Sequence, residues 1–212
     1  MSFDSDAFGD GAVLGCDFTG IVQKVGDGVT RLRKGDAVAG LVWGASVGQY
    51  AIQEAAKYQL RIVTTCSPKH FDTVKKFGAH HVFDYRSQGV VEQIKSAAPD
   101  LKYVFDTIGS RSSSGLASQA VRSTGGTLCT VRPGKANTED VDSSVEVTDV
   151  LPSKDDHELA AELFEKLPEW LETGIIKANA TRILPGLESV PKGFDMHRNG
   201  DISGFKVVYQ LG

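Results

Sequence analysis

Residues 40–52 read GLVWGASVGQYAI, and this stretch decides the fold class of the chain. An apolar run from Gly40 to Trp43 leads into a turn of small residues, 44–48, and then into a helical pattern that begins at Gln49. A strand, a small-residue turn and a helix N-terminus bring unpaired backbone N–H groups and the positive end of a helix dipole to one point, which suits a pyrophosphate. The stretch therefore predicts a nucleotide-binding βαβ unit, although a turn of this kind can also serve tight packing alone.

The next predicted strand, 61–65, ends without a carboxylate. At this point of a dinucleotide-binding unit an Asp or Glu bonds the ribose 2′-OH of NAD, whereas basic and hydroxyl side chains accept the 2′-phosphate of NADP. The residues that follow the strand are Ser67, Pro68, Lys69 and His70, and the first acid is Asp72. Ser67 can donate to a phosphate oxygen and Lys69 can supply charge, so NADPH is the expected cofactor. Ser67 can equally cap a helix that starts at Pro68, and one hydroxyl can serve both roles.

Short apolar runs separated by helical stretches predict parallel β-strands joined by helices. The expected strands of this sheet are 40–43, 61–65, 81–83, 103–105 and 127–131, and a closing strand is expected near 204–211. A turn signal at 26–28 and a second at 34–36 predict a hairpin, or part of a small barrel, within residues 1–40. The fold class is therefore α/β.

Two features are expected after the sheet. The polar residues 133–156 are expected to form a loop that crosses an edge of the sheet. The apolar stripe of residues 159–171 predicts a helix that stops at Gly174. Pro168 removes one backbone hydrogen bond, so we expect this helix to break or bend near residues 167–168.

The composition is that of a soluble protein, with 23 basic and 27 acidic side chains among 212 residues and a formal net charge of −4. No block of Lys and Arg provides the clustered positive charge that nucleic acid requires. No apolar run approaches the roughly 20 residues of a membrane helix, and the first residues are acidic, unlike a secretory signal. Three scattered cysteines suggest neither disulfides nor a zinc knuckle. We expect a cytoplasmic protein that acts on small molecules, with no nucleic acid or membrane partner.

Several segments carry a family resemblance. They are GCDFTGIV at 15–22, KGDAVAG at 34–40, SVGQYA at 46–51, FGA at 77–79 and VFDY at 82–85. Together they resemble the zinc-independent branch of the medium-chain dehydrogenase/reductase superfamily. The segments TTCSPKHFD at 64–72, LPEWL at 167–171 and ISGFKVVY at 202–209 are similar to fungal trans-acting enoyl reductases that serve polyketide synthases.

The resemblance implies NADPH-dependent reduction of the carbon–carbon double bond of an α,β-unsaturated acyl thioester carried by a polyketide synthase, in secondary-metabolite or toxin biosynthesis. It also implies a Rossmann-type doubly wound parallel sheet with a reduced GroES-like β-barrel remnant, no metal and a monomeric protein. Carried over by position, Ala45, Ser46, Val47 and Gly48 would face the pyrophosphate, Ser67, Pro68, Lys69 and His70 the 2′-phosphate, Tyr85 the adenosine side, and Ile202 and Ser203 the nicotinamide end.

The expected domains are a partial GroES-like segment at 1–40, a Rossmann NADP-binding domain at 41–174 and a segment at 175–212 that returns to the GroES-like part. The chain departs from the family in a shorter turn at 44–48 and in the direct run from Gly40 into Leu41, where relatives insert much of the substrate domain. No proton donor can be assigned, because the segments that would hold one are absent. Two alternatives stay open: a catalytically inactive relative that binds nucleotide or a partner, and a quinone-reductase-like NADPH oxidoreductase.

Three other residue types are candidates for a site. Asp106, at the carboxyl end of a predicted strand, can bind a ligand or can cap the following helix. Cys66 has no general base near it in sequence, which disfavours a nucleophilic role. The five histidines show no zinc-ligand spacing with cysteines or acids.

Overall fold

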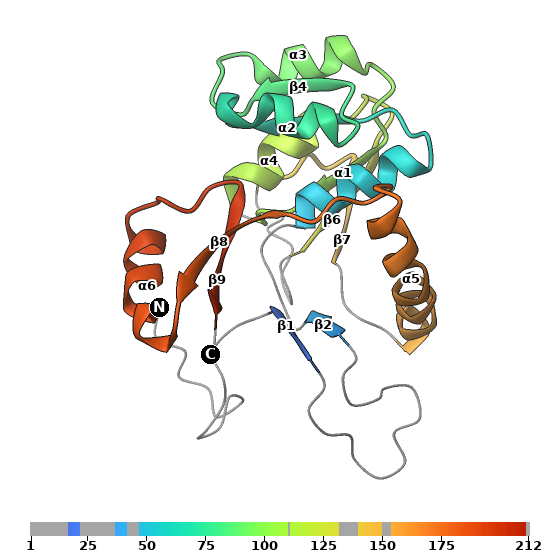
Figure 1. Cartoon of the computed structure of the whole chain (residues 1–212). Helices are drawn as coiled ribbons and strands as arrows, with labels where there is room; N and C mark the ends of the chain where they lie inside the picture. The colour runs from blue at the N-terminus through green and yellow to red at the C-terminus, as the bar shows by residue number, and fades with distance from the viewer. Residues whose placement is uncertain are drawn as a thin grey trace. The chain divides into compact units, whose positions relative to one another are not determined.

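The computed structural model describes the backbone of residues 17–21, 37–41, 47–109, 111–131, 140–149 and 154–210. The chain divides into two compact units, residues 1–46 and residues 47–212. Figure 1 labels the helices and strands of both units. Two of the predicted pyrophosphate residues, Ala45 and Ser46, lie outside the described residues.

The described part of the first unit is a β-hairpin. Strand β1 (Asp17–Ile21) pairs antiparallel with strand β2 (Ala37–Leu41), with Asp17 opposite Leu41. The predicted hairpin is confirmed. The prediction that Gly40 and Leu41 open the parallel sheet is wrong, because their backbone groups already face β1 in antiparallel register. The rest of that predicted strand, at 42–43, lies outside the described residues.

The second unit contains the parallel sheet strands that the sequence predicts. Strand β3 (Val63–Cys66) pairs in parallel with β4 (His81–Asp84). Strand β5 (Tyr103–Asp106) pairs in parallel with β6 (Gly126–Thr130). In a doubly wound sheet of order 3-2-1-4-5-6, these pairs supply the positions on either side of the first strand.

A strand that sequence reasoning missed forms one side of the three-stranded sheet. Strand β7 (Val145–Asp149) pairs in parallel with β6 and lies within the stretch 133–156 that was expected to be a loop. That expectation is wrong for residues 145–149. The physical reason is the alternation of this segment, because Val145 and Val147 pack with the fully buried Leu128 of β6.

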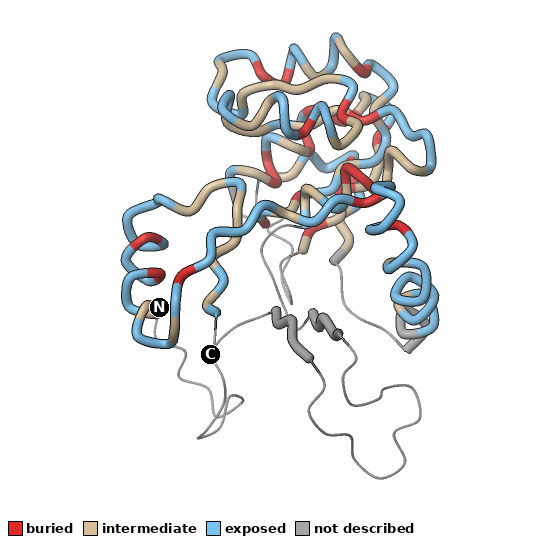
Figure 2. Tube along the Cα trace, in the orientation of Figure 1, coloured by how far each residue is buried: buried red, intermediate tan, exposed pale blue. Residues whose placement is uncertain are grey.

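Four helices alternate with the strands and cover the sheet. They are α1 (Val47–Lys57), α2 (Phe71–Lys76), α3 (Val90–Ala97) and α4 (Arg111–Gln119). Helices α1 and α2 pack Ile52 and Val74 against the β3–β4 pair, and α4 packs Ala117 against Leu128. Figure 2 shows that the buried residues concentrate in this alternating part. These contacts give the α/β class that the sequence predicts.

Helix α5 (Lys154–Glu172) is a single helix of 19 residues with Pro168 inside it. The predicted helix is confirmed, and it continues through residues 167–168 without a break. The alternative, a bend at these residues, stays a prediction. Proline removes only its own N–H, which leaves the carbonyl of Phe164 without that donor. The Phe164 residue is 51% exposed, so this position lies at a surface that water can reach.

The carboxyl end of α5 is fastened to α1. The Lys57 ammonium lies 3.3 Å from the centre of the Trp170 ring. The buried Gln53 amide donates to the carbonyl oxygen of Lys177 at 3.1 Å and accepts from its N–H at 2.6 Å. The Gln53 side chain therefore makes two complementary hydrogen bonds with the backbone of Lys177, just after the helix, in the way that a neighbouring strand would.

The end of the chain forms a separate two-stranded parallel sheet. Strand β8 (Ala180–Pro185) pairs with β9 (Phe205–Gln210), and α6 (Val190–Arg198) follows the short helix η3 (Leu187–Ser189) between them. The predicted closing strand is confirmed as β9. All of these elements lie in the unit 47–212, and their assignment to a GroES-like part stays a prediction.

Candidate nucleotide-binding site

The residues after β3 form a short, carboxylate-free corner. Ser67 precedes the helix η2 (Pro68–His70), and Pro68 occupies the first helical position. Ser67 has the extended backbone of a capping residue, with φ −66° and ψ 145°, yet its hydroxyl makes no capping hydrogen bond. Both roles predicted for Ser67 therefore fit its backbone, and the hydroxyl is not engaged as a cap.

The C-terminal segment meets this corner at His70. The Nε2 atom of His70 lies 2.8 Å from the Ser203 hydroxyl oxygen. The imidazole lies against Gly204, where a Cβ atom would fall 2.5 Å from His70 Cε1. Partial burial, and then the charge of Lys69, lowers the pKa of His70. The ring is therefore mainly neutral near pH 7 until an anion approaches it.

The neighbouring strand β4 brings an arginine to the same edge. Cys66 pairs with Asp84, so Ser67 and Tyr85 occupy the next positions on two adjacent parallel strands. Asp84 Oδ1 accepts hydrogen bonds from the backbone N–H of Arg86 at 3.0 Å and from its Nε at 3.2 Å. These bonds lower the pKa of Asp84. Asp84 is thus bonded to Arg86, and the sequence analysis did not single out Arg86.

The helix α1 begins at a second point on the carboxyl edge. Val47 and Gly48 are its first residues, and its first turn carries no acidic side chain. A Cβ atom on Gly48 would lie 3.3 Å from the hydroxyl of Thr107, directly after β5. The N-terminus of α1 therefore lies beside the carboxyl end of β5. Its positive dipole end and free N–H groups suit a pyrophosphate.

Both carboxylate oxygens of Asp106, at the end of β5, accept hydrogen bonds from the turn and helix that follow it. Its Oδ1 atom accepts from the N–H groups of Ile108 and Gly109 at 2.9 and 3.1 Å. Its Oδ2 atom accepts from the hydroxyls of Ser113 and Ser114, both at 2.8 Å. The carboxylate is buried and serves the start of α4. The four donors are two N–H groups of the turn after β5 and two serine hydroxyls of α4, so Asp106 joins the turn to the helix. A capping bond from a backbone N–H of α4 is not among these four, and the capping role stays a prediction.

Cys66 and the histidines supply no further chemistry here. Burial, and then the nearby Asp84, raises the pKa of the Cys66 thiol, which keeps the thiol protonated at neutral pH. Within the described ranges, no three His, Cys, Asp or Glu side chains gather closely enough to hold a metal ion.

The structure brings some predicted site residues together and moves others. Ser67, Lys69, His70 and Tyr85 gather at the carboxyl ends of β3 and β4. Ser203 was expected at the nicotinamide end, but its hydrogen bond places it beside His70, the residue assigned to the 2′-phosphate. The contact joins Ser203 to the β3 corner, and its predicted place at the nicotinamide end stays a prediction. Its neighbour Ile202 is half-buried.

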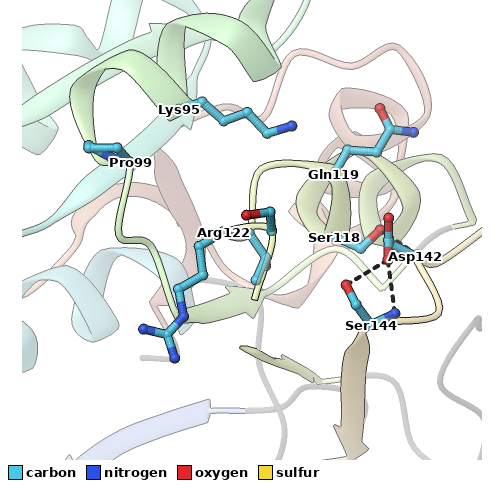
Figure 3. A pocket seen from close by; sticks show the side chains of 9 residues that line it. Lys95, Pro99, Ser118, Gln119, Arg122, Asp142 and Ser144 are labelled. Carbon is cyan, nitrogen blue, oxygen red and sulfur yellow. Dashed lines mark hydrogen bonds between the residues drawn. The ribbon is translucent and has the colours of Figure 1, made fainter. Parts of the chain in front are cut away.

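A cavity of about 540 Å³ lies elsewhere in the second unit. Figure 3 shows Lys95, Ser118, Asp142 and Ser144 around it, with Ser144 donating to Asp142 through both its N–H and its hydroxyl. These bonds lower the pKa of Asp142. The cavity opens just before β6 and β7, hence at the amino ends of the strands. Ligands of open α/β sheets bind at the carboxyl ends, so we do not place the nucleotide in this cavity.

The donor set at the β3 corner fits a phosphate ester of a nucleotide. It offers an ammonium, two hydroxyls and an imidazole, and the nearest strand-end carboxylate is already bonded to Arg86. In the described parts of the chain, no helix is both long and apolar enough to cross a membrane.

Two family models match the chain. The model described as zinc-binding dehydrogenase matches residues 46–154, just over half of the sequence. The model described as alcohol dehydrogenase GroES-like domain matches residues 4–80. The second match extends past the hairpin unit into helix α2.

Curated relatives are about one third identical to this chain over the aligned residues. A trans-enoyl reductase of Alternaria alternata is 32% identical over 98% of this chain and 66% of the relative. A trans-enoyl reductase of Aspergillus japonicus is 34% identical over 81% of this chain and 52% of the relative. The chain thus spans between half and two thirds of the length of these relatives.

Solved structures share the fold at lower identity. A putative zinc-dependent alcohol dehydrogenase from Rhizobium etli superposes with a TM-score of 0.75 at 19% identity, over 94% of this chain and 81% of that one. The quinone oxidoreductase of Escherichia coli, solved in complex with NADPH, gives a TM-score of 0.69 at 18% identity, over 90% and 80%. These likenesses show the fold.

Proposed function

The chain belongs to the zinc-binding dehydrogenase family of the medium-chain dehydrogenase/reductase superfamily, and on that premise we propose that it is an NADPH-dependent enoyl reductase. Its substrate is the α,β-unsaturated acyl thioester carried by a polyketide synthase in a fungal secondary-metabolite pathway. The relatives named trans-enoyl reductases support this reaction class. The synthase is what the sequence resemblance implies. The cytoplasmic location is expected from the composition, and the monomeric state is part of the same proposal.

One observation carries the choice of cofactor. The first described parallel strand ends in Ser67, Pro68, Lys69 and His70, with no carboxylate at the position that would bond a ribose 2′-OH. The carboxylate opposite, Asp84, is bonded to Arg86. A 2′-phosphate gains charge-assisted hydrogen bonds from Lys69, Ser67 and Ser203, whereas the bare hydroxyl of NADH gains little. The corner therefore favours NADPH.

The other cofactor contacts are assigned to residues along the carboxyl edge of the strands. The N-terminus of α1, with Val47 and Gly48, takes the pyrophosphate, together with Ala45 and Ser46 of the turn before it. Tyr85 lies on the adenosine side. Ser203 holds the phosphate corner through His70, and Ile202 precedes it on the approach to β9.

NADPH held by the corner at residues 67–70 and the N-terminus of α1 would supply the hydride that the β-carbon of the substrate needs, and a proton donor would have to supply the proton for the α-carbon. The contribution of the protein is to orient the two partners and to stabilise the enolate charge. No described residue is assigned as the proton donor.

The function is tested by titrating the full chain with NADPH and with NADH while following nicotinamide fluorescence. We expect NADPH to bind more tightly than NADH. Binding is followed by an oxidation assay with an enoyl thioester beside a quinone. Oxidation with the thioester alone supports the proposal, and oxidation with the quinone alone supports the quinone-reductase alternative. Failure of both nucleotides to bind at millimolar concentration supports the inactive relative.

The cofactor corner is tested by Lys69→Ala. Loss of the ammonium is expected to weaken NADPH about tenfold and to leave NADH unchanged, because one charge-assisted phosphate contact is worth about 1.5 kcal/mol. Lys192→Ala removes a similar exposed lysine from α6 and is the matched control. Equal losses for both nucleotides would contradict the 2′-phosphate role of Lys69.

A further inference from the structure

We propose that Arg86 binds the adenine ring of the cofactor by stacking its guanidinium plane on the base. The inference rests on the proposed function, because it needs a nucleotide at the β3–β4 edge. Neither the family resemblance nor the motifs of the sequence single out Arg86. Its location, its restraint by Asp84 and its open surface carry the inference.

The location places Arg86 on the adenosine side. The β3–β4 register ends with Cys66 opposite Asp84, so the chain continues into Ser67 on one strand and Tyr85 on the other. Adjacent strands lie about 5 Å apart. Arg86 therefore follows the phosphate corner at a separation of one strand, which suits the base attached to a ribose held at that corner.

Arg86 is restrained before any ligand arrives. Asp84 Oδ1 accepts from its backbone N–H and from its Nε, so one carboxylate oxygen fixes both ends of the residue. The guanidinium carbon lies 5.1 Å from the centre of the Tyr85 ring, within the range of a cation–π contact. A side chain held in this way loses little further conformational entropy when a base covers it.

The surface offered is flat and open. The Arg86 side chain is 59% exposed, and Tyr85 is 51% exposed. The guanidinium lies over the Tyr85 ring, so a base would stack on the face of the guanidinium that points away from this ring. Arginine planes and aromatic rings are the groups on which proteins stack nucleobases.

The carboxylate decides between the base and the phosphate as the target of Arg86. Asp84 compensates the guanidinium charge, which reduces its attraction for a phosphate dianion, whereas stacking uses the plane and survives that compensation. Lys69 and the imidazole of His70, which carry no bonded carboxylate among the contacts described above, remain the phosphate ligands. Arg86 therefore binds the base of the adenosine end, and Lys69 and His70 bind its phosphate.

The test measures the affinity of the full chain for two fragments, 5′-AMP and 2′,5′-ADP, by calorimetry. Wild type is expected to bind 2′,5′-ADP more tightly than 5′-AMP. Arg86→Lys keeps the charge and removes the plane, and it is expected to weaken both fragments about fivefold, the size of an exposed cation–π or stacking contact. Arg86→Gln is expected to do the same, whereas Lys69→Ala weakens only 2′,5′-ADP.

The matched control is Arg198→Gln, which breaks a comparable exposed arginine–aspartate pair, with Asp195 of α6. It is expected to leave both affinities unchanged. Loss of 2′,5′-ADP affinity alone in the Arg86 variants, or no loss at all, overturns the inference while the proposed function stands. Wild type that binds neither fragment overturns the proposed function itself. The Nε–Hε signal of Arg86 in wild type gives a readout that needs no variant: it must shift when 5′-AMP is added.

Discussion

The tripeptide Val-Phe-Asp occurs twice at the end of a parallel strand, once in β4 and once in β5. The two aspartates differ in burial and in hydrogen-bond partners. Residues 82–84 and 104–106 have the same sequence and the same place in a βα unit. Asp106 is 6% exposed and accepts four hydrogen bonds from its own turn and helix. Asp84 is bonded to one residue, Arg86, at an open edge.

The difference teaches how the residues after a strand decide its function. After Asp106 come Ile108, Gly109 and the serines of α4, whose donors close around the carboxylate. After Asp84 comes a tyrosine and an arginine, whose long side chains cannot enclose it. One strand end is therefore a structural joint, and the other is the exposed end at which we propose that a ligand binds.

The largest effect is expected from a substitution of Asp106, in the Val-Phe-Asp tripeptide of β5. Asp106→Ala leaves two N–H groups and two hydroxyls without their acceptor in a buried place, which costs about 3 kcal/mol of unfolding free energy. Urea denaturation measures the loss. Asp84→Ala, the same change in the other copy, is expected to leave the urea midpoint unchanged. Equal losses in both variants would contradict the division between joint and ligand surface.

The next largest effect is expected from a substitution in the C-terminal segment that contacts His70, at the edge where β3 and β4 end. Gly204 has φ +78°, and a Cβ there falls 2.5 Å from the His70 ring. Gly204→Ala is expected to cost about 2 kcal/mol from backbone strain and from displacement of the ring, and also to weaken NADPH.

Gly174→Ala separates the two causes, because Gly174 has φ +74° and no atom within 4 Å of the added Cβ. It carries the same backbone strain without the clash and is expected to leave NADPH binding unchanged. A loss of NADPH affinity in Gly174→Ala as large as that in Gly204→Ala would remove the argument for the His70 contact.

A smaller effect depends on pH. His70 has a lowered pKa in the free protein, so it is neutral at pH 8, and a 2′-phosphate beside it favours the protonated ring. Binding of NADPH then takes up a proton, and its affinity is expected to rise a few fold as pH falls from 8 to 6.5. Affinity for NADH should stay flat. His70→Asn removes the slope, and His197→Asn, an exposed histidine of α6, keeps it.

The smallest effect tests the restraint of Arg86. Asp84→Asn removes the charge that fixes the guanidinium and is expected to weaken 5′-AMP about twofold, because the stacking surface becomes less ordered. Affinity for 2′,5′-ADP should fall less or rise, since the freed arginine can then reach the phosphate. Calorimetry with both fragments measures the change. A larger loss for 2′,5′-ADP than for 5′-AMP would contradict this account.

Sequence reasoning found most of the second unit because its signals are local. Apolar runs located β3, β4, β5, β6 and β9 to within two residues, and the absence of an acid after β3 indicated NADPH. Sequence reasoning failed where a strand pairs with a segment that is distant in the sequence. Residues 145–149 became a strand through pairing with β6, and Gly40–Leu41 joined an antiparallel hairpin although their composition suits a parallel strand equally well.

The amino-acid order was sufficient for the α/β class, the family and the chemical character of the residues after β3, because hydrophobic periodicity and side-chain type act over a few neighbouring residues. The tertiary structure alone showed that Ser203 meets His70, 133 residues away along the chain, and that two identical tripeptides differ in their hydrogen-bond partners. Such contacts depend on which segments the fold brings together. The free energy of a buried carboxylate depends on its donors in space, and no local pattern records them.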